Sequence, residues 1–142
     1  RGLEFVTRKI SHSVARISLK KQDKLHLGNI DAQRDWGFAG DYVEAMWLML
    51  QSPTPSDFVI ATGQNHSVRE FVELAFATVG IRDWNKYVIS NKPSHMRPAE
   101  VDYLIGDATR ARKILGWKPK TSFRQLIEMM VKADLAVEKR EK

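Results

Sequence analysis

The stretch RDWGFAGDYVEAMWLMLQSPTPSDFVIATG, residues 34–63, contains the pattern that decides the fold class. Gly40 and Asp41 precede an apolar run over residues 42–51, and an acidic residue in the first turn favours a helix. The proline-rich SPTPSD that follows is typical of a loop. The short apolar FVIAT, residues 58–62, ends at a glycine and predicts a buried strand. The stretch therefore indicates a helix followed by a strand.

Helical and extended patterns alternate along the rest of the chain. Upstream, the apolar spacing predicts a helix over residues 5–20, and KLHLGNID predicts a strand that runs into a turn. Downstream, HSVREFVELAFATVG predicts a helix with a capping box of Ser67 and Glu70 and a glycine stop. KYVIS predicts a short strand, and two last helices are expected to begin at Asp107 and Ser122. This order predicts an α/β fold.

Length and composition are those of a soluble globular protein. The chain has 142 residues, 43% of them hydrophobic and 28% charged, which suits one domain over residues 1–142. No apolar run approaches the roughly 20 residues of a membrane span, so no membrane partner is expected. The absence of cysteine excludes disulfides and thiolate metal sites and is compatible with a cytoplasmic location.

The formal net charge of +6 raises the question of an anionic partner. Lysine and arginine are spread over every segment, and no basic run is interleaved with aromatic residues. This distribution favours an anionic small molecule, and nucleic acid is kept as a weaker alternative.

Sequence motifs of complete enzymes are missing. There is no glycine-rich dinucleotide loop after a strand, no P-loop, no HExxH and no GxSxG. The histidines lie singly, without metal-ligand spacing, at His12, His26, His66 and His95. We therefore predict no catalytic residue and no metal site in this chain, and a binding role instead.

Basic side chains at three places are candidates for contact with an anion. Lys9 follows the start of the first predicted helix, where backbone N–H groups also favour anions, and a solvated polar face is the alternative that spacing alone favours. Arg34 offers a guanidinium suited to a phosphate, but a local ion pair with Asp35 is the alternative. Arg97 and Glu100 could together bind a pyrophosphate and hydroxyl groups, or form a loop ion pair.

Large apolar side chains are predicted to be core or packing residues. This applies to the four tryptophans, which could otherwise serve as base-stacking platforms, and to the methionines on helical runs. The residues concerned are Trp36, Trp47, Trp84, Trp117, Met46, Met49, Met129 and Met130.

Four segments carry a resemblance to a known family. RGLEFVTRKIS, LGNIDAQRDWGFAGDYVEAMWLMLQ, FVIATGQNHSVREFVELAF and RPAEVDYLIGDATRARKILGWKPKTSF resemble the C-terminal part of the GDP-mannose 4,6-dehydratases. These belong to the extended short-chain dehydrogenase/reductase superfamily. The match covers nearly the whole chain and is weakest over residues 82–94. It implies a helix-rich mixed α/β substrate domain, which in the family follows a doubly wound NADP domain.

The resemblance also implies a reaction. In this family a bound NADP takes hydride from C4 of the mannose of GDP-mannose, water is eliminated across C5 and C6, and hydride returns to C6. The product, GDP-4-keto-6-deoxymannose, is a precursor of GDP-fucose. The cofactor performs the redox chemistry, while protein groups position the substrate and handle protons.

The resemblance assigns roles to individual positions. Arg1 is similar to an arginine that contacts NADP near a subunit interface. The first helix and FVIAT would normally dock on the missing sheet of the NADP domain, and their exposed apolar face predicts a homo-oligomer or a rearranged dimer. Val6 and Lys9 are similar to residues that meet the guanosine, and Arg34 to an arginine that binds the diphosphate. Arg97 and Glu100 are similar to the pair that binds the diphosphate and a sugar hydroxyl. Asp35 and Trp36 are then expected to be the scaffold that aims Arg34.

The family's N-terminal half is not represented in this sequence. That half holds the NADP loop, the catalytic Thr and Glu and the Tyr-x-x-x-Lys pair, so we expect this chain alone to be inactive as a dehydratase. Two alternatives remain open at this point. One is a non-enzymatic remnant that binds nucleotide sugars or mediates oligomerisation, and the other is a related epimerase or reductase.

Overall fold

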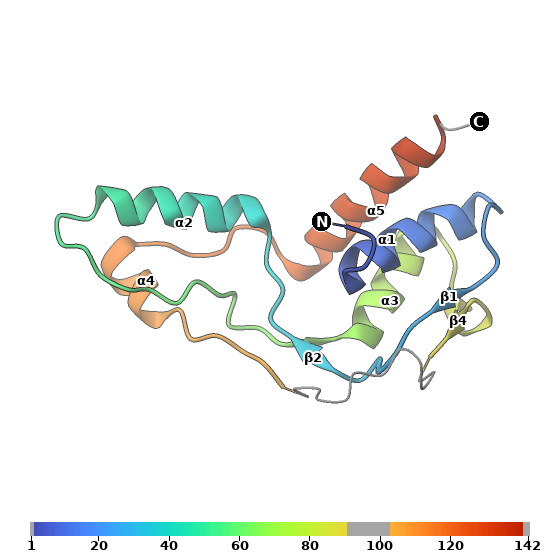
Figure 1. The fold of residues 1–142 in the computed structure, drawn as a ribbon, viewed down its shortest axis with the longest axis horizontal. Helices are drawn as coiled ribbons and strands as arrows, with labels where there is room; N and C mark the ends of the chain where they lie inside the picture. The colour runs from blue at the N-terminus through green and yellow to red at the C-terminus, as the bar shows by residue number, and fades with distance from the viewer. Residues whose placement is uncertain (1, 91–102, 141–142) are drawn as a thin grey trace. The chain divides into compact units, whose positions relative to one another are not determined.

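The computed structural model describes residues 2–90 and 103–140. The fold is helix-rich and mixed α/β, as predicted, with very short strands (Figure 1). The elements are α1 (Val6–Ser18), β1 (Leu25–His26), β2 (Gln33–Arg34), α2 (Ala39–Gln51), β3 (His66–Ser67), α3 (Val68–Thr78), the 3-10 helix η1 (Trp84–Lys86), β4 (Val88–Ile89), α4 (Thr109–Leu115) and α5 (Phe123–Glu138). Within the described ranges, no helix combines the length and the apolar character that crossing a membrane requires.

Residue contacts divide the chain into two compact units. The first unit comprises Arg1–Ala32, Ser67–Asp102 and Ile127–Lys142, and the second comprises Gln33–His66 and Tyr103–Leu126. The expectation of a single domain over residues 1–142 stays a prediction, because units defined by contacts are not necessarily separate domains.

An apolar helix face builds the core of the first unit. Ile10, Val14 and Ile17 recur on one face of α1 and are buried, with α1 packed against α3. On α3 the side chains of Phe71 and Phe76 are fully buried. Each such side chain stabilises the fold by about 1.5–3 kcal/mol relative to an exposed one. The helical spacing predicted over residues 5–20 is thus confirmed.

The start and the end of α3 follow the sequence signals. Ser67 Oγ accepts a hydrogen bond from the Glu70 N–H at 3.1 Å, and Glu70 Oε2 accepts one from the Ser67 N–H at 2.6 Å. This is the predicted capping box. Gly80 follows the helix with φ +78°, a conformation that glycine adopts without strain.

A short parallel sheet pairs β1 with β4 in the first unit. Leu25 lies opposite Val88, and the Leu25 N–H donates to the Tyr87 carbonyl at 2.8 Å. The strands predicted in KLHLGNID and KYVIS are confirmed, although each has only two residues. A second two-stranded sheet consists of β2 and β3.

Buried carboxylates join α5 to α1 in the first unit. Asp134 accepts a hydrogen bond from Ser11 Oγ at 2.6 Å and forms an ion pair with Arg8. Glu138, one turn further along α5, lies 2.9 Å from His12 Nε2. Both carboxylates are almost fully buried. Arg8 therefore faces α5.

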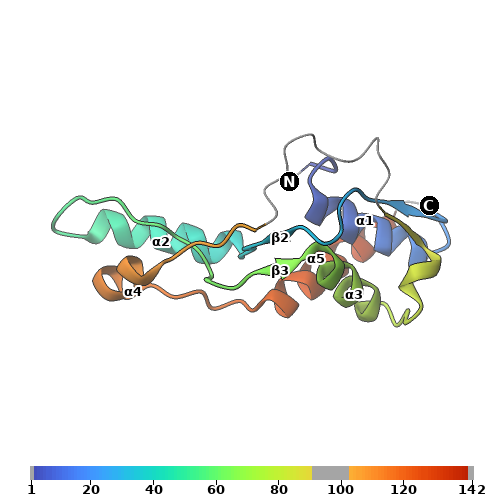
Figure 2. The same ribbon diagram turned by 90° about the horizontal axis from the view of Figure 1, so that it is seen from below.

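The second unit is built around α2 and α4, which lie side by side (Figure 1, Figure 2). Their core contains Ala45, Ala111 and Trp117, all buried. Trp117 Nε1 donates to the Asp41 carbonyl at 2.8 Å. The carboxylate of Asp41 accepts two further hydrogen bonds, from the N–H groups of residues 120 and 121 at 3.0 and 2.9 Å. These bonds fix the segment after α4 to the start of α2.

Of the caps predicted for the last two helices, Ser122 at α5 forms the expected bonds and Asp107 at α4 is not the cap. The N-cap residue of α4 is Ala108, which has no side-chain cap hydrogen bond, although the Thr109 N–H donates to Asp107 Oδ1 at 2.8 Å. At α5, the Gln125 N–H donates to Ser122 Oγ at 3.3 Å, and Gln125 Oε1 accepts from the Ser122 N–H at 2.9 Å. The hydroxyl and amide groups thereby satisfy backbone groups that a helix start leaves unpaired.

Two expectations about apolar segments are wrong. FVIAT forms no strand in the described structure, and Val59 within it is 56% exposed. A strand needs a neighbouring strand for its ladder bonds, and the described residues provide none beside this segment. Core positions were also predicted for Met46, Trp47 and Met129, which are 60%, 59% and 41% exposed.

Candidate functional site

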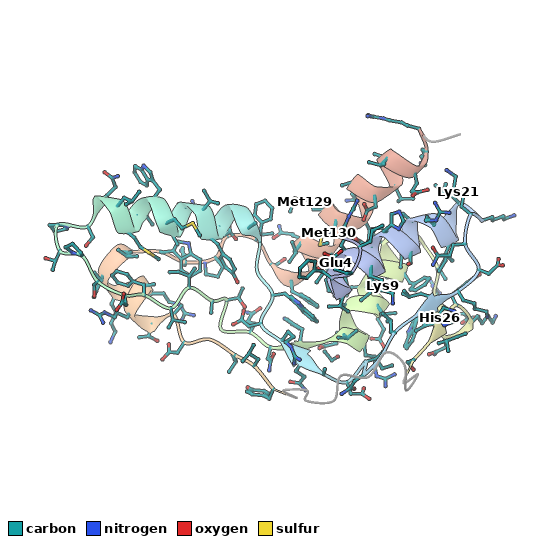
Figure 3. The ribbon with its side chains drawn as sticks, in the orientation of Figure 1. Glu4, Lys9, Lys21, His26, Met129 and Met130 are labelled. Atoms are coloured by element: carbon teal, nitrogen blue, oxygen red, sulfur yellow. The ribbon has the colours of Figure 1, made fainter. Side chains whose placement is uncertain are left out.

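The first turns of α1 carry two of the predicted contact residues. Val6 begins the helix, and Lys9 lies on the next turn, where its N–H donates to the Phe5 carbonyl at 2.8 Å. Both side chains are half-buried, and Figure 3 shows Lys9 on α1. No side-chain cap hydrogen bond forms at Phe5, and the first turn contains no acidic residue. A helix start of this kind is favourable for a negatively charged group.

Arg34 ends β2 in the second unit and is half-buried. Its Nη1 donates to the carbonyl of Gln33 at 2.6 Å, so the guanidinium lies close to its own strand. A guanidinium presents five N–H donors, and a bidentate contact with a phosphate uses two of them. A guanidinium at this position can form charge-assisted hydrogen bonds with an anionic group.

Asp35, the residue after Arg34, is bonded to two distant segments of the same unit. Its Oδ1 accepts from the Thr62 N–H at 3.0 Å and from the Thr62 hydroxyl at 2.5 Å. Its Oδ2 accepts from the N–H groups of Gly63 at 2.9 Å and Gly106 at 3.3 Å. Sequence analysis had considered only a local ion pair with Arg34 or a general scaffold role, and it missed all three of these partners.

Tyr42 lies close to this junction. Burial raises the pKa of the Tyr42 phenol, and the negative charges of Asp35 and Asp41 raise it further. An added Cβ at Gly37 would lie 2.2 Å from the Tyr42 hydroxyl oxygen, so a larger residue there would require the Tyr42 ring to shift. The phenol therefore stays protonated at neutral pH and can donate a hydrogen bond beside the Asp35 carboxylate.

The residue after Asp35, Trp36, takes part in a stack of aromatic rings. Trp36 stacks on Phe123 with ring centroids 5.9 Å apart, and His66 stacks on Phe123 at 3.9 Å. Trp36 therefore makes packing contacts, as predicted. A cavity of about 220 Å³ is lined by Trp36, His66 and Lys120, among others. A larger one of about 470 Å³ lies between the end of α2 and α4. Arg34 lines neither cavity, so neither is assigned to the diphosphate.

The described residues include only part of the predicted site. Val6 and Lys9 come together on α1, and Arg34 lies in the other unit. Arg1, Arg97 and Glu100 lie outside the described residues. Among residues 2–90 and 103–140, no group of three or more histidine or acidic side chains is arranged to hold a metal ion.

The resemblance assigns one residue to a dinucleotide cofactor, Arg1, which lies outside the described residues. The sequence contains no glycine-rich loop of the kind that binds a pyrophosphate. None of the described residues is therefore assigned to a dinucleotide.

Comparison with known proteins gives a consistent result. Residues 1–130 match the family model described as GDP-mannose 4,6 dehydratase. The chain is 55% identical to GDP-mannose 4,6 dehydratase 1 of Arabidopsis thaliana over 100% of this chain and 39% of that protein. It is 49% identical to GDP-mannose 4,6 dehydratase of Homo sapiens, over 95% of this chain and 40% of that protein. The chain thus spans about two fifths of the length of these relatives.

Solved structures with low sequence identity share the fold. RMD from Pseudomonas aeruginosa, solved with NADPH, superposes with a TM-score of 0.85 at 22% identity, over 96% of this chain and 44% of that chain. dTDP-glucose 4,6-dehydratase from Bacillus anthracis, solved with NAD, superposes with a TM-score of 0.76 at 19% identity, over 98% of this chain and 42% of that chain. The predicted superfamily fold is confirmed.

Proposed function

This chain belongs to the GDP-mannose 4,6-dehydratase family, and on that premise we propose that it is the nucleotide-sugar-binding portion of such an enzyme. The whole enzyme would convert GDP-mannose to GDP-4-keto-6-deoxymannose with NADP as the cofactor. The observation that carries the proposal is the match of residues 1–130 to the family model, supported by 55% identity over the whole chain. Identity at this level also favours a dehydratase over the epimerases and reductases that share only the fold.

Charge and position suggest how the chain would bind the substrate. Val6 and Lys9 would meet the guanosine at the start of α1, because an apolar side chain and a cation stand there on adjacent turns. Arg34 would bind the diphosphate through its guanidinium. Arg97 and Glu100 would add a second cation and an acceptor for a sugar hydroxyl. Arg1 would contact the cofactor.

We also propose that the chain acts in the cytoplasm as a homo-oligomer and binds neither nucleic acid nor membrane. The absence of cysteine supports a reducing location. Support for self-association comes from the exposed apolar side chains of α2, among them Met46 and Trp47.

A chimaera tests the proposed function. The corresponding C-terminal segment of the Arabidopsis thaliana relative is replaced by this chain, and formation of a 4-keto sugar from GDP-mannose is measured. We expect activity in the chimaera and none in the 142-residue chain alone, because catalytic groups are predicted to lie outside it.

Variants of the chimaera separate binding from folding. Arg34→Ala is expected to lower kcat/KM by about tenfold or more, as the loss of a charge-assisted contact does. Lys113→Ala, an exposed cation on α4, is the matched control and should leave kcat/KM unchanged. An inactive chimaera with a native circular dichroism spectrum would contradict the proposed function.

A further inference from the structure

Asp35 occupies the junction of three chain segments in the second unit. Its two carboxylate oxygens accept four hydrogen bonds from Thr62, Gly63 and Gly106, at 2.5–3.3 Å. Three of the four donors are backbone N–H groups, so the contact fixes the path of the chain as well as side-chain positions. The Thr62 hydroxyl also accepts from the Gln64 N–H at 3.1 Å, which extends the network around the turn.

The backbone at the junction is adapted to this contact. Gly63 has φ +75°, in the left-handed region that glycine favours, and this conformation presents its N–H to Asp35. At Gly106 an added Cβ would lie 2.3 Å from the Cβ of Ala61, so the two segments approach more closely than any larger residue allows. The segments around residues 61–63 and 106 are therefore packed against each other and both bonded to one carboxylate.

Arg34 directly precedes this anchor. Arg34 is the last residue of β2 and Asp35 follows it directly, so the bonds of Asp35 to residues 62, 63 and 106 fix the backbone beside Arg34. An arginine loses much rotamer freedom when it binds, and binding sites tolerate only about 0.5 Å of displacement. A fixed backbone at residue 35 reduces both losses.

We propose that Asp35 is a positioning residue for diphosphate binding, which acts by holding the Arg34 backbone against the turn at residues 62–63 and against Gly106. The inference rests on the proposed function, because it takes Arg34 to be the diphosphate contact. Asp35 itself does not touch the ligand; a carboxylate in contact with a diphosphate would repel it. It follows that Asp35 should affect the diphosphate-dependent part of the affinity and leave the guanosine-dependent part unchanged.

Calorimetry with GDP and with guanosine measures the two parts separately. The ratio of the two affinities reports the contribution of the diphosphate. In Asp35→Asn, which keeps the shape but replaces one acceptor oxygen with a donor, we expect this ratio to fall by about three- to tenfold. Arg34→Ala should lower it at least as much, and the double variant should match Arg34→Ala.

Asp41→Asn is the matched control. Like Asp35, Asp41 accepts hydrogen bonds from backbone N–H groups, two of them at 3.0 and 2.9 Å, but it is more deeply buried and anchors the segment after α4. This variant should lower the thermal midpoint without changing the ratio. If Asp35→Asn does not fold, Thr62→Val is used instead, because it removes only the hydroxyl donor to Asp35. It should lower the affinity ratio by less than the three- to tenfold expected for Asp35→Asn. Thr62→Ser keeps a hydroxyl donor and should restore the ratio.

Two results would overturn the inference in distinguishable ways. If Asp35→Asn weakens GDP and guanosine equally while Arg34→Ala lowers the ratio, Asp35 has only a structural role and the proposed function stands. If the parent chain binds GDP no better than guanosine, the assignment of Arg34 fails, and the inference about Asp35 fails with it.

Discussion

Arg16 of α1 and Glu138 of α5 form an ion pair in which Nη1 of Arg16 lies 3.1 Å from Oε2 and 3.3 Å from Oε1 of the glutamate. The carboxylate is almost fully buried, and His12 and Lys21 add further positive charge around it. Asp134, one turn earlier on α5, accepts a hydrogen bond from the Ser11 hydroxyl at 2.6 Å. Ion pairs and hydrogen bonds therefore attach the end of α5 to α1 at these positions.

The stability of the chain should depend on pH through Glu138. Burial raises the pKa of Glu138, but the hydrogen bond from Arg16 and the charges of Arg16, His12 and Lys21 outweigh it and hold the pKa below its usual range. A carboxyl group with a lowered pKa stabilises the fold above its unfolded pKa, and this contribution is lost as pH falls through the folded pKa.

Urea unfolding between pH 7 and pH 3 measures this contribution. We expect Glu138→Gln to be less stable than the parent at pH 7, and the difference to shrink as pH falls below about 4.3, the ordinary pKa of glutamate. Glu73→Gln, on the exposed side of α3, is the control and should not differ from the parent. A constant difference over the whole pH range would show that Glu138 does not contribute through its charge.

The capping box of α3 should contribute measurably to stability. Ser67→Ala removes the acceptor of the Glu70 N–H and is expected to lower the free energy of unfolding by about 1 kcal/mol. Ser67→Asp keeps an acceptor at the same place and should recover most of the loss. Equal stability of Ser67→Ala and the parent in urea denaturation would contradict the assigned cap.

The close approach at Gly106 predicts a clash that a second change relieves. In Gly106→Ala the new Cβ would lie 2.3 Å from the Cβ of Ala61, and overpacking of this kind destabilises by about 1–3 kcal/mol. Ala61→Gly removes the clashing atom, so the double variant should be more stable than Gly106→Ala alone. If the two changes are additive in thermal unfolding, these two positions are not in contact.

The exposed face of α2 should mediate self-association of the chain in isolation. Val43, Met46, Trp47 and Leu50 follow helical spacing and are 60%, 60%, 59% and 82% exposed. Light scattering after size exclusion should show an oligomer, with the double variant Met46→Gln, Trp47→Gln shifted toward the monomer. The control Lys113→Gln on α4 should not shift it. A monomeric parent at high concentration would contradict this prediction.

Local signals determined most of what the sequence predicted correctly. Ser67 with Glu70, and Ser122 with Gln125, mark helix starts through hydrogen bonds between residues three apart, so the sequence alone contains both partners. The spacing of Ile10, Val14 and Ile17 likewise contains the information for a buried helix face.

Expectations that depend on distant chain segments were less accurate. The segment at residues 58–62 has the composition of a strand, but a strand also requires a neighbour, which composition does not specify. For the same reason, the helical run around Trp47 was predicted correctly and its burial was not. Apolar character shows that a residue can be buried, and only the fold determines what covers it.

In the candidate site, too, local sequence signals identified single residues but not the contacts between distant segments. Residue type and resemblance identified Val6, Lys9 and Arg34 as contacts for a nucleotide sugar, and these assignments stay predictions. The partners of Asp35 at residues 62, 63 and 106 could not be found from local spacing, because they are far away in the sequence. The glycine that ends FVIAT was the one local signal of a specialised turn.

Calorimetric titration of the chain with GDP-mannose and with a UDP-hexose tests the central claim most directly, because the claim is that these residues bind a GDP-sugar. We expect heat of binding with GDP-mannose, weaker or absent binding with the UDP-hexose, and an affinity for GDP-mannose that falls by about tenfold in Arg34→Ala. Equal affinity for the two sugar nucleotides, or GDP-mannose binding that Arg34→Ala leaves unchanged, would contradict the account.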